Sequence, residues 1–481
     1  MTSTETPTNG NTSRLALGRA LISYLILPNA VFLIVGGFGY MSRPLVNLDY
    51  LFLGAVAGLM WPPAAIGVYG LLVAVDAFVS LAPVFHFGLE NAVVALPFVF
   101  QLGWGAALLA LLCGIGVAAV AVVGMKVSGE RRGRWRPSLL VGALLLFVLD
   151  GLNGTSGLFG ADRARVGFNI ATSAVYTAGR SAYQRTFGRE KIVAVASSTE
   201  TLRGIAASDA PHESLGATDI ILVIVESLGH FKDSMEDSVV LGPLLSPNIR
   251  QLYTIRTGTV PTRGATTSGE LRELCGVRAD FRDVNRIDLQ TCLPPVLRGQ
   301  GFRTVAIHGY SGAFFDRYKW YAQLGFERVL FAEDLARMGV TGFCGATFQG
   351  LRDLAVGRVV EREVLAVRQL RERRFVYWMT LSSHLPVDAS CATGTTLPCP
   401  QDDGRHSFQD VCTLMQIQRL VAQSVAEIAA NPALSPTRFI VVGDHPPPFF
   451  SRNMRSQFAE NDVPFIELIP KRRRSTDLRA H

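Results

Sequence analysis

Charged residues are scarce in the first third of the chain, and this scarcity separates two parts of the molecule. Of the 481 residues, 49% are hydrophobic and 18% are charged, and the mean hydropathy is +0.27. These values exclude a wholly soluble protein. The sequence is almost continuously apolar between Leu15 and Asp150, whereas from about Arg163 onward charges reach an ordinary globular density. We therefore expect a membrane domain followed by a globular domain.

Basic residues beside the apolar segments predict the orientation of the membrane domain. Arg14 and Arg19 place the N-terminus in the cytoplasm, and the arginine-rich loop 131–136 lies on the same side, because basic loops stay inside. At about 20 residues per crossing, the predicted spans are residues 17–38, three spans within 51–123, and 138–152. An odd number of spans places everything after them outside the cytoplasm.

This topology divides the chain into four parts. Residues 1–14 form a polar, disordered cytoplasmic tail, 15–155 the membrane domain, 156–217 a juxtamembrane linker, and 218–481 an extracytoplasmic domain. Aromatic and basic residues alternate in the linker, which is typical of amphipathic helices lying on a lipid surface. An ordinary solvated linker helix is the alternative.

Cysteine usage agrees with an external domain. The chain has no Cys-x-x-Cys pair, which argues against a cysteine zinc site, and six of its seven cysteines lie in the predicted external domain. An even number fits three disulfides in an oxidising compartment. Proximity in the sequence suggests the pairs Cys275 with Cys292, Cys391 with Cys399, and Cys344 with Cys412.

Strand-like and helical segments alternate through the external domain. The apolar, β-branched runs are residues 219–225, 303–307, 375–381, 438–442 and 463–469. Helical periodicity is found in residues 351–374 and 408–430. Alternation of this kind predicts a mainly parallel sheet covered by helices.

Polar side chains follow four of these strand-like runs. Glu226 ends the first run, His308 and His384 end two others, and Asp444 with His445 follows the fourth. The carboxyl ends of parallel strands meet at one edge of the sheet, where open α/β folds bind ligands. Carboxylates and neutral imidazoles are suitable ligands for a divalent cation. The sequence therefore predicts a metal or catalytic site at this edge.

Hydroxyl side chains at residues 266–268 precede a helical pattern. A helix N-terminus favours an anion, and a hydroxyl there could act as a nucleophile. Threonine and serine are also ordinary helix caps, and Glu270 would complete a capping box. On local sequence alone, capping is the preferred interpretation.

In order and spacing, these motifs resemble the lipoteichoic acid synthase and phosphoglycerol transferase branch of the alkaline phosphatase/sulfatase superfamily. The matching motifs are Val-Glu226-Ser-Leu-Gly, Thr-Thr267-Ser-Gly-Glu, His308 with Phe314-Phe315-Asp316-Arg317, Ser383-His384-Leu-Pro386 and Gly443-Asp444-His445. They cover residues 218–470, and five N-terminal spans match as well. The resemblance implies an alkaline phosphatase/sulfatase-like α/β domain on the periplasmic side of a bacterial inner membrane.

The resemblance also implies a role for each matching residue. Thr267 would be the nucleophile, with Thr266 as the alternative, and His384 would join it in catalysis. The implied ligands of one divalent metal, manganese or zinc with magnesium also possible, are Glu226, Thr267, Asp444 and His445. The implied substrate-binding residues are His308, Phe315, Arg317 and His384. Phe315 stands where relatives often have tryptophan.

The implied activity moves a phosphoglycerol head group from a membrane phospholipid, similar to phosphatidylglycerol, to a glycan or glycolipid acceptor through a phospho-threonine. A phosphoethanolamine transferase is the main alternative, although its usual Glu-Thr-Ala-Arg is replaced here by Glu226-Ser-Leu-Gly. A phosphodiesterase and a non-catalytic membrane sensor are further alternatives. Sulfatase chemistry is excluded because Cys292-Leu-Pro-Pro-Val lacks the arginine of Cys-x-Pro-x-Arg.

The net charge of +7 does not indicate a nucleic-acid partner. Basic residues gather at the membrane flanks and in the tail 471–474, rather than along one face of a domain. The oligomeric state is not indicated by the sequence.

Overall fold

The computed structural model describes residues 9–37, 44–81, 115–116, 119–120, 122–123, 135–152, 170–186, 192–208, 217–370, 372–399, 409–434, 436–449 and 451–471. The chain forms two compact units. The first comprises Met1–Val93, Leu102–Arg189 and Phe450–Arg452, and the second Val94–Gln101, Glu190–Phe449 and Asn453–His481.

The first unit is helical. Its helices are α1 (Asn9–Leu21), a π-helical turn (Ile22–Ile26), α2 (Leu27–Gly37), α3 (Leu48–Val56), α4 (Pro62–Leu81), α7 (Arg136–Leu152) and α8 (Ala174–Thr186). Among the described residues, two segments are long and apolar enough to cross a membrane, Arg14–Ile34 and Pro62–Ser80. The predicted last span coincides with α7, whereas most of residues 82–134 lie outside the described ranges. The five spans therefore stay a prediction.

Two buried aspartates attach the segment before α8 to the helical bundle. Asp49 accepts hydrogen bonds from the Ser173 hydroxyl at 2.6 Å and from the Val175 N–H at 2.9 Å. Asp150, near the end of α7, accepts one from the Ala171 N–H at 3.0 Å. Buried carboxylates need such donors, and these bonds fix where α8 begins.

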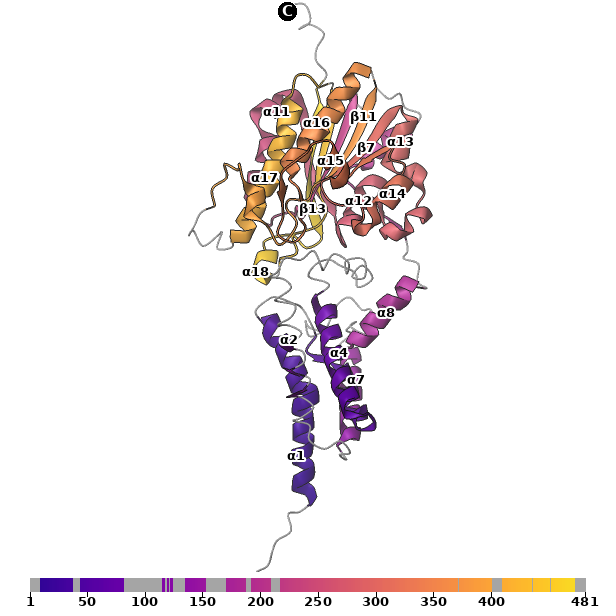
Figure 1. Ribbon diagram of the computed structural model, residues 1–481, viewed down its shortest axis with the longest axis vertical. Helices are drawn as coiled ribbons and strands as arrows, with labels where there is room; N and C mark the ends of the chain where they lie inside the picture. Colours follow the sequence, from indigo (N-terminus) through magenta and orange to yellow (C-terminus); the bar gives the residue numbers. More distant parts are fainter. Residues whose placement is uncertain are drawn as a thin grey trace, which may run out of the picture. The chain divides into compact units, whose positions relative to one another are not determined.

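The second unit is built on a seven-stranded sheet with the order β5-β13-β12-β4-β11-β7-β8 (Figure 1). Its strands are β4 (Asp219–Val225), β5 (Tyr253–Pro261), β7 (Phe302–His308), β8 (Arg328–Leu330), β11 (Arg373–Met379), β12 (Thr437–Gly443) and β13 (Asp462–Pro470). The five strands from β12 to β8 are parallel. Strand β13 pairs antiparallel with both β12 and β5, so β13 runs against the other six strands of this sheet. The predicted mainly parallel sheet is confirmed, and β5 and β8 were not predicted.

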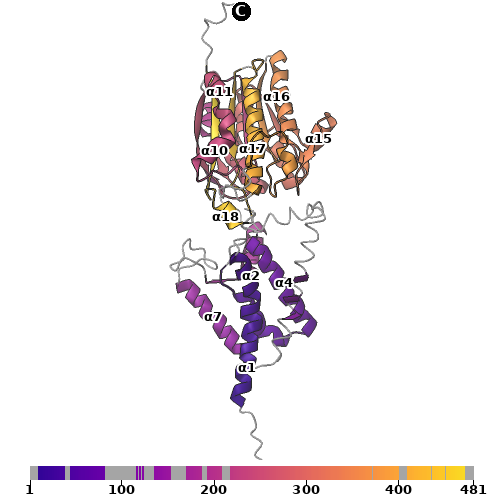
Figure 2. The same cartoon turned by 90° about the vertical axis from the view of Figure 1, so that its left-hand side faces the viewer.

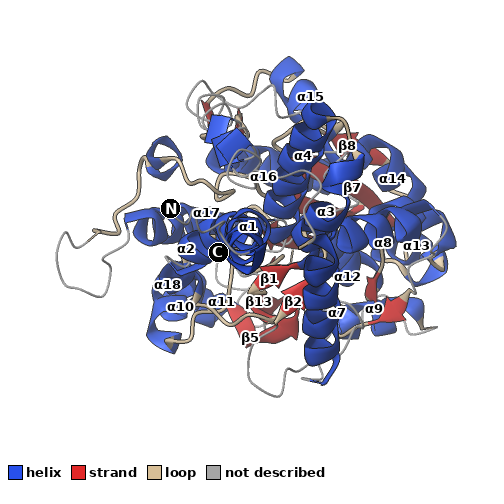
Figure 3. Ribbon diagram, turned by 90° about the horizontal axis from the view of Figure 1, so that it is seen from below, coloured by secondary structure: helices blue, strands red, loops and turns tan. Residues whose placement is uncertain are grey.

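Helices cover both faces of this sheet. One face carries α10 (Ser234–Leu241), α11 (Pro247–Leu252), α16 (Asp353–Leu370) and α17 (Gln409–Ala430) (Figures 1 and 2). The opposite face carries α12 (Thr266–Cys275), α13 (Leu293–Gly299) and α14 (Arg317–Gln323) (Figure 3). The central strand β4 is consequently buried at every position, as expected for a parallel strand covered on both sides.

Three disulfides lie in the second unit. Cys275 is bonded to Cys292, as predicted. The other two predicted pairs are wrong, because Cys344 is bonded to Cys391 and Cys399 to Cys412. Cys391 lies in a 3₁₀ turn that packs with Cys344 against Ile417 of α17. This tertiary contact, rather than the short separation of Cys391 and Cys399 in the sequence, decides the pairing.

Asp353, at the start of α16, holds the loop that follows β11. Its carboxylate accepts hydrogen bonds from the N–H groups of Leu381 at 3.0 Å and Ser382 at 2.8 Å. The residue is 2% exposed. Burial raises its carboxyl pKa to about 6, although the two backbone hydrogen bonds oppose this. The protonated form therefore predominates up to about pH 6.

This residue gives a pH-dependent prediction. Because the folded pKa of about 6 exceeds the unfolded value of 3.8, the contribution of Asp353 to stability is complete below pH 3.8 and is lost as the pH rises through 6. Relative to Asp353→Asn, the wild-type free energy of unfolding should fall by about 2 kcal/mol between pH 4 and pH 8. Urea unfolding of both proteins in detergent tests this, and parallel pH profiles would contradict it.

Candidate active site

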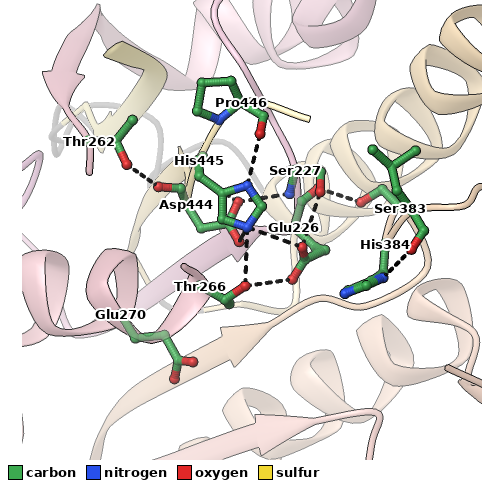
Figure 4. Close-up of polar contacts among 12 residues, drawn as sticks. Glu226, Ser227, Thr262, Thr266, Glu270, Ser383, His384, Asp444, His445 and Pro446 are labelled. Carbon is green, nitrogen blue, oxygen red and sulfur yellow. Dashed lines mark hydrogen bonds and ion pairs between the residues drawn. The ribbon is translucent and has the colours of Figure 1, made fainter. Parts of the chain in front are cut away.

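The register of the parallel strands brings the predicted site residues to one edge of the sheet. Val225 is paired with Gly443, so Glu226 and Asp444, the next residue of each strand, lie side by side. Glu226, Asp444 and His445 each place a ligand atom within 4.8 Å of the others, and all three are buried (Figure 4). Three of the four predicted metal ligands therefore form one cluster.

The backbone around Glu226 is fixed by hydrogen bonds with the segment that follows β11. Its N–H donates to the Thr380 hydroxyl at 2.9 Å, and its carbonyl accepts from the Ser383 hydroxyl at 2.6 Å. Ser227 follows with a φ of 55°, a left-handed conformation that costs energy for a residue other than glycine. This turn lets the Ser227 hydroxyl donate to Glu226 Oε1 at 3.1 Å and thereby orients the carboxylate.

Asp444 keeps one carboxylate oxygen without a hydrogen bond. Oδ1 accepts from the N–H groups of Ser227 at 2.8 Å and His445 at 2.7 Å. Oδ2 is buried and accepts no hydrogen bond from the described residues, and it lies 3.3 Å from His445 Nε2. Burial, followed by the charge of Glu226, raises the carboxyl pKa of Asp444 to about 6. A buried oxygen of this kind is unfavourable unless a cation binds it.

His445 presents Nε2 to the two carboxylates. Its Nδ1–H donates to the Pro446 carbonyl at 2.9 Å, so Nε2 is the ring nitrogen that faces the carboxylates and could coordinate a metal. Burial alone would lower the imidazole pKa, but the charges of Asp444 and Glu226 outweigh it and raise the pKa. Two carboxylates and one imidazole are a donor set suited to zinc or manganese. The cluster therefore fits one divalent metal.

Thr266, rather than Thr267, lies against this cluster. The Thr266 Oγ1 is 3.3 Å from both Glu226 Oε2 and His445 Nε2, whereas the Thr267 hydroxyl makes no hydrogen bond to any residue described. The geometry therefore brings Thr266, the sequence-based alternative, rather than Thr267 to the predicted metal ligands. The preferred capping interpretation is wrong, because the N-cap is Ala265 and carries no side-chain hydrogen bond.

Arg272 and Thr262, which were not predicted as site residues, support the backbone of Asp444. The Arg272 guanidinium donates to the carbonyls of Gly443 at 2.6 Å and Asp444 at 3.2 Å. The Thr262 hydroxyl donates to the same Asp444 carbonyl at 2.6 Å. Arg272 is itself paired with the buried Glu273 at 2.6 Å. These contacts join the strand end of β12 to helix α12, and nothing in the local sequence distinguishes them from surface polar residues.

Gly269 lets α12 approach the metal cluster. A Cβ at this position would lie 2.9 Å from both the Cα and Cβ of Asp444, closer than carbon atoms pack. We predict that Gly269→Ala displaces α12 and lowers kcat/KM by at least about tenfold, since small misplacements at an active site are costly. Gly204→Ala, on a helix position with open space around it, is the control. Equal activity of the two variants would contradict this prediction.

The two predicted substrate-binding histidines have the same tautomer as His445. His308 Nδ1–H donates to the Met379 carbonyl at 3.0 Å, and His384 Nδ1–H donates to the Leu385 carbonyl at 2.7 Å. Burial, together with a smaller contribution from the charge of Arg317, lowers the imidazole pKa of His308 to about 3 and that of His384 to about 4. Both rings are therefore neutral at pH 7, with Nε2 able to accept a proton or a hydrogen bond.

Arg317 and Phe315 are also buried beside these histidines. The guanidinium of Arg317 lies over the Phe315 ring, 5.3 Å from its centroid. Phe315 has a φ of 56° and packs against Phe314 and Phe281. The aromatic ring therefore supports Arg317 from one side, and the predicted substrate-binding residues occur together in one part of the unit.

The model of the sulfatase family matches residues 218–466. A candidate cyclic beta-1,2-glucan modification protein of Rhizobium meliloti (strain 1021) is 24% identical over 242 residues, which cover 48% of this chain and 36% of that protein. The chain thus spans about a third of the length of the curated relative it matches.

Solved structures with a similar fold include three bacterial enzymes or domains. The lipoteichoic acid synthase LtaP of Listeria monocytogenes has 13% identity and a TM-score of 0.39, with 57% of this chain and 72% of that chain covered. The phosphoglycerol transferase GacH of Streptococcus pyogenes, in complex with sn-glycerol-1-phosphate, has 16% identity and a TM-score of 0.35, with 57% of this chain and 78% of that chain covered. The C-terminal periplasmic domain of EptC from Escherichia coli, in complex with zinc, has 13% identity and a TM-score of 0.35, with 53% of this chain and 73% of that chain covered.

Proposed function

Because the chain belongs to the sulfatase family of the alkaline phosphatase superfamily, we propose that it transfers a phosphoglycerol head group from a membrane phospholipid to a glycan or glycolipid. Residues 218–481 would form the extracytoplasmic catalytic domain, and residues 15–155 would anchor it beside its lipid donor. The observation that carries this proposal is the Thr266 hydroxyl, 3.3 Å from both Glu226 and His445, within a buried set of divalent-metal ligands.

Glu226, Asp444 and His445 would hold the metal, zinc or manganese. When bound, such an ion lowers the pKa of a nearby hydroxyl and neutralises charge on phosphoryl oxygens. In the first half-reaction, Thr266 Oγ1 attacks phosphorus and its proton passes to Glu226 Oε2, the acceptor of its hydrogen bond. The Oγ1–P bond forms as the bond from phosphorus to the diacylglycerol oxygen breaks. The departing diacylglycerol oxygen takes that proton from Glu226, relayed through a water molecule, so Glu226 is again a carboxylate.

His384 would serve the second half-reaction. Its Nδ1–H is held by the Leu385 carbonyl, so Nε2 is free to accept the proton of an acceptor hydroxyl. The acceptor oxygen bonds to phosphorus, the Oγ1–P bond breaks, and the released Thr266 oxygen takes the proton that His384 received. The first N–H groups of α12, which have no partner within the helix, would bind the phosphoryl oxygens together with Arg317 and His308.

The charges around the site favour phosphoglycerol over phosphoethanolamine. An ethanolamine ammonium would need an acidic partner, but the buried carboxylates described here already have other roles. Glu226 and Asp444 face the metal position, and Glu270 is paired with Arg317. A neutral glycerol group is therefore the better match for the head group.

The head group can be identified by the mass of the covalent intermediate. We expect the detergent-solubilised full-length protein, incubated with zinc and phosphatidylglycerol but no acceptor, to gain a phosphoglycerol adduct after an acid quench. Trypsin cleavage after Arg263 and Arg272 isolates residues 264–272, and fragmentation separates Thr266 from Thr267. An adduct formed only from phosphatidylethanolamine would overturn the head-group assignment. If neither lipid gives an adduct with zinc, manganese or magnesium, the proposed transferase activity is overturned.

A further inference from the structure

Glu270 occupies a buried position between the nucleophile helix and the substrate-binding arginine. It follows Thr266 by four residues on α12, so both side chains project from one face of the helix. Glu270 is fully buried, and its Oε1 accepts hydrogen bonds from Arg317 Nε at 3.0 Å and Nη2 at 2.7 Å. Its Oε2 accepts from the hydroxyls of Tyr321 and Tyr377. All of these partners are buried as well.

This arrangement leaves one amino group of Arg317 for another acceptor. Nε and Nη2 are bound by Glu270, whereas Nη1 makes no hydrogen bond to the residues that the structure describes. The Phe315 ring lies against the guanidinium, so the plane of the group is fixed as well as its position. The charge of Arg317 lowers the pKa of His308, of His384 and of the Glu226 carboxyl. Arg317 therefore lies within electrostatic range of Glu226 and of both histidines.

A buried arginine without its carboxylate would not keep this position. An unpaired buried cation is strongly unfavourable, and the two hydrogen bonds that Glu270 Oε1 accepts from Nε and Nη2 fix the orientation of the guanidinium. Glu270 thus holds Arg317 in the orientation that leaves Nη1 for the substrate.

We propose that Glu270 is a positioning residue that ties the orientation of Arg317 to the helix carrying Thr266. The hydroxyls of Tyr321 and Tyr377 hold the second oxygen of the carboxylate, so that Oε1 stays directed at Arg317. One helix turn then sets the distance between the nucleophile and the cation that binds the phosphoryl group. This inference rests on the proposed function, because it assigns Arg317 to the transferred phosphate.

A double-mutant cycle tests this coupling. Glu270→Gln preserves the shape of the side chain, and Arg317→Gln removes the cation. For head-group transfer with saturating zinc, we expect kcat/KM to fall about 30-fold in Glu270→Gln, about 100-fold in Arg317→Gln, and no further in the double variant. A purely structural role for Glu270 would instead multiply the two losses, and that result would overturn the proposal.

A matched control separates positioning from loss of a buried ion pair. Glu467 on β13 is equally buried and is paired with Arg438 and Arg256, so Glu467→Gln removes a similar interaction outside the site. We expect its kcat/KM to stay within about threefold of wild type. Equal losses in Glu467→Gln and Glu270→Gln would overturn the proposal.

A binding measurement distinguishes failure of this inference from failure of the proposed function. Glycerol phosphate should bind the zinc-loaded wild type, and it should bind Glu270→Gln about tenfold more weakly. Its affinity for the double variant should equal its affinity for Arg317→Gln. If the wild type transfers the head group but the Glu270→Gln loss persists in the Arg317→Gln background, only this inference fails. If the wild type neither binds glycerol phosphate nor transfers the head group, the proposed function fails and this inference fails with it. Should Glu270→Gln not fold, Tyr377→Phe, which removes one donor to Oε2, is expected to show the same coupling to Arg317 with a smaller loss.

Discussion

Replacing Thr266 by alanine is expected to lower kcat/KM for head-group transfer by at least about a thousandfold. Its hydroxyl lies 3.3 Å from both Glu226 and His445, so removing it leaves no attacking oxygen at the metal ligands. Thr267→Ala is the matched control, because it removes the same atoms from the adjacent residue of the same buried helix. Its kcat/KM should stay within about threefold of wild type.

The measurement combines turnover with detection of the adduct on residues 264–272. Thr266→Ser, which keeps an oxygen but loses a methyl group, should retain measurable transfer and an adduct on the new serine. Zinc affinity and the free energy of unfolding should be similar in all these variants, since Thr266 is not needed for the Glu226, Asp444 and His445 contacts. A variant set in which Thr267→Ala loses the adduct and Thr266→Ala keeps it would identify Thr267 as the nucleophile.

The choice between the two threonines shows where sequence reasoning reaches its limit. Successive residues of an α-helix differ in direction by about 100°, so only one of them can face a given site. Which one does so depends on how α12 is seated against β12, and therefore on the close approach of Gly269 to Asp444. The sequence contains this glycine, but the contact is formed by residues far apart in the chain.

The strands that carry the metal ligands were predictable for a physical reason. The runs before Glu226 and Asp444 are uninterrupted apolar stretches, because β4 and β12 are buried on both faces. A polar residue directly after such a run must lie at the strand end. Parallel pairing then brings these ends together without further information about the helices.

The edge strand β5 and the role of Glu270 could not be predicted in this way. Most positions of β5 between Tyr253 and Pro261 are at least partly exposed, so this strand has no continuous apolar run in the sequence. Glu270 has the spacing of a capping residue, yet it is buried against Arg317, which follows it by 47 positions. Both features are decided by tertiary contacts that periodicity does not record.

Replacing Asp444 by asparagine is expected to lower zinc affinity by at least about a hundredfold while leaving the fold intact. The amide oxygen can still accept the hydrogen bonds from Ser227 and His445 that Oδ1 receives. The amide nitrogen replaces Oδ2, the buried oxygen without a hydrogen-bond donor, so the metal loses a charged ligand. Transfer activity should fall with the metal affinity.

The metal-free proteins should show the opposite order of stability. In wild type, the Asp444 and Glu226 carboxylates are buried together, and each raises the cost of ionising the other. Asparagine removes this repulsion, so Asp444→Asn should unfold at a higher temperature than wild type in the presence of a chelator. Added zinc should then raise the Tm of wild type, because a ligand that binds the folded state stabilises it, and should leave the variant almost unchanged.

Asp237→Asn provides the control for this reversal. Asp237 is a partly buried carboxylate paired with His230, outside the metal cluster. Its replacement removes a favourable interaction rather than a repulsion, so this variant should be less stable than wild type with or without zinc and should keep the zinc-dependent rise in Tm. If Asp444→Asn were instead destabilised in chelator and still stabilised by zinc, the carboxylate would be a structural group. A higher Tm of Asp444→Asn than of wild type in chelator, reversed by zinc, would therefore show that the two buried carboxylates are arranged to bind a cation.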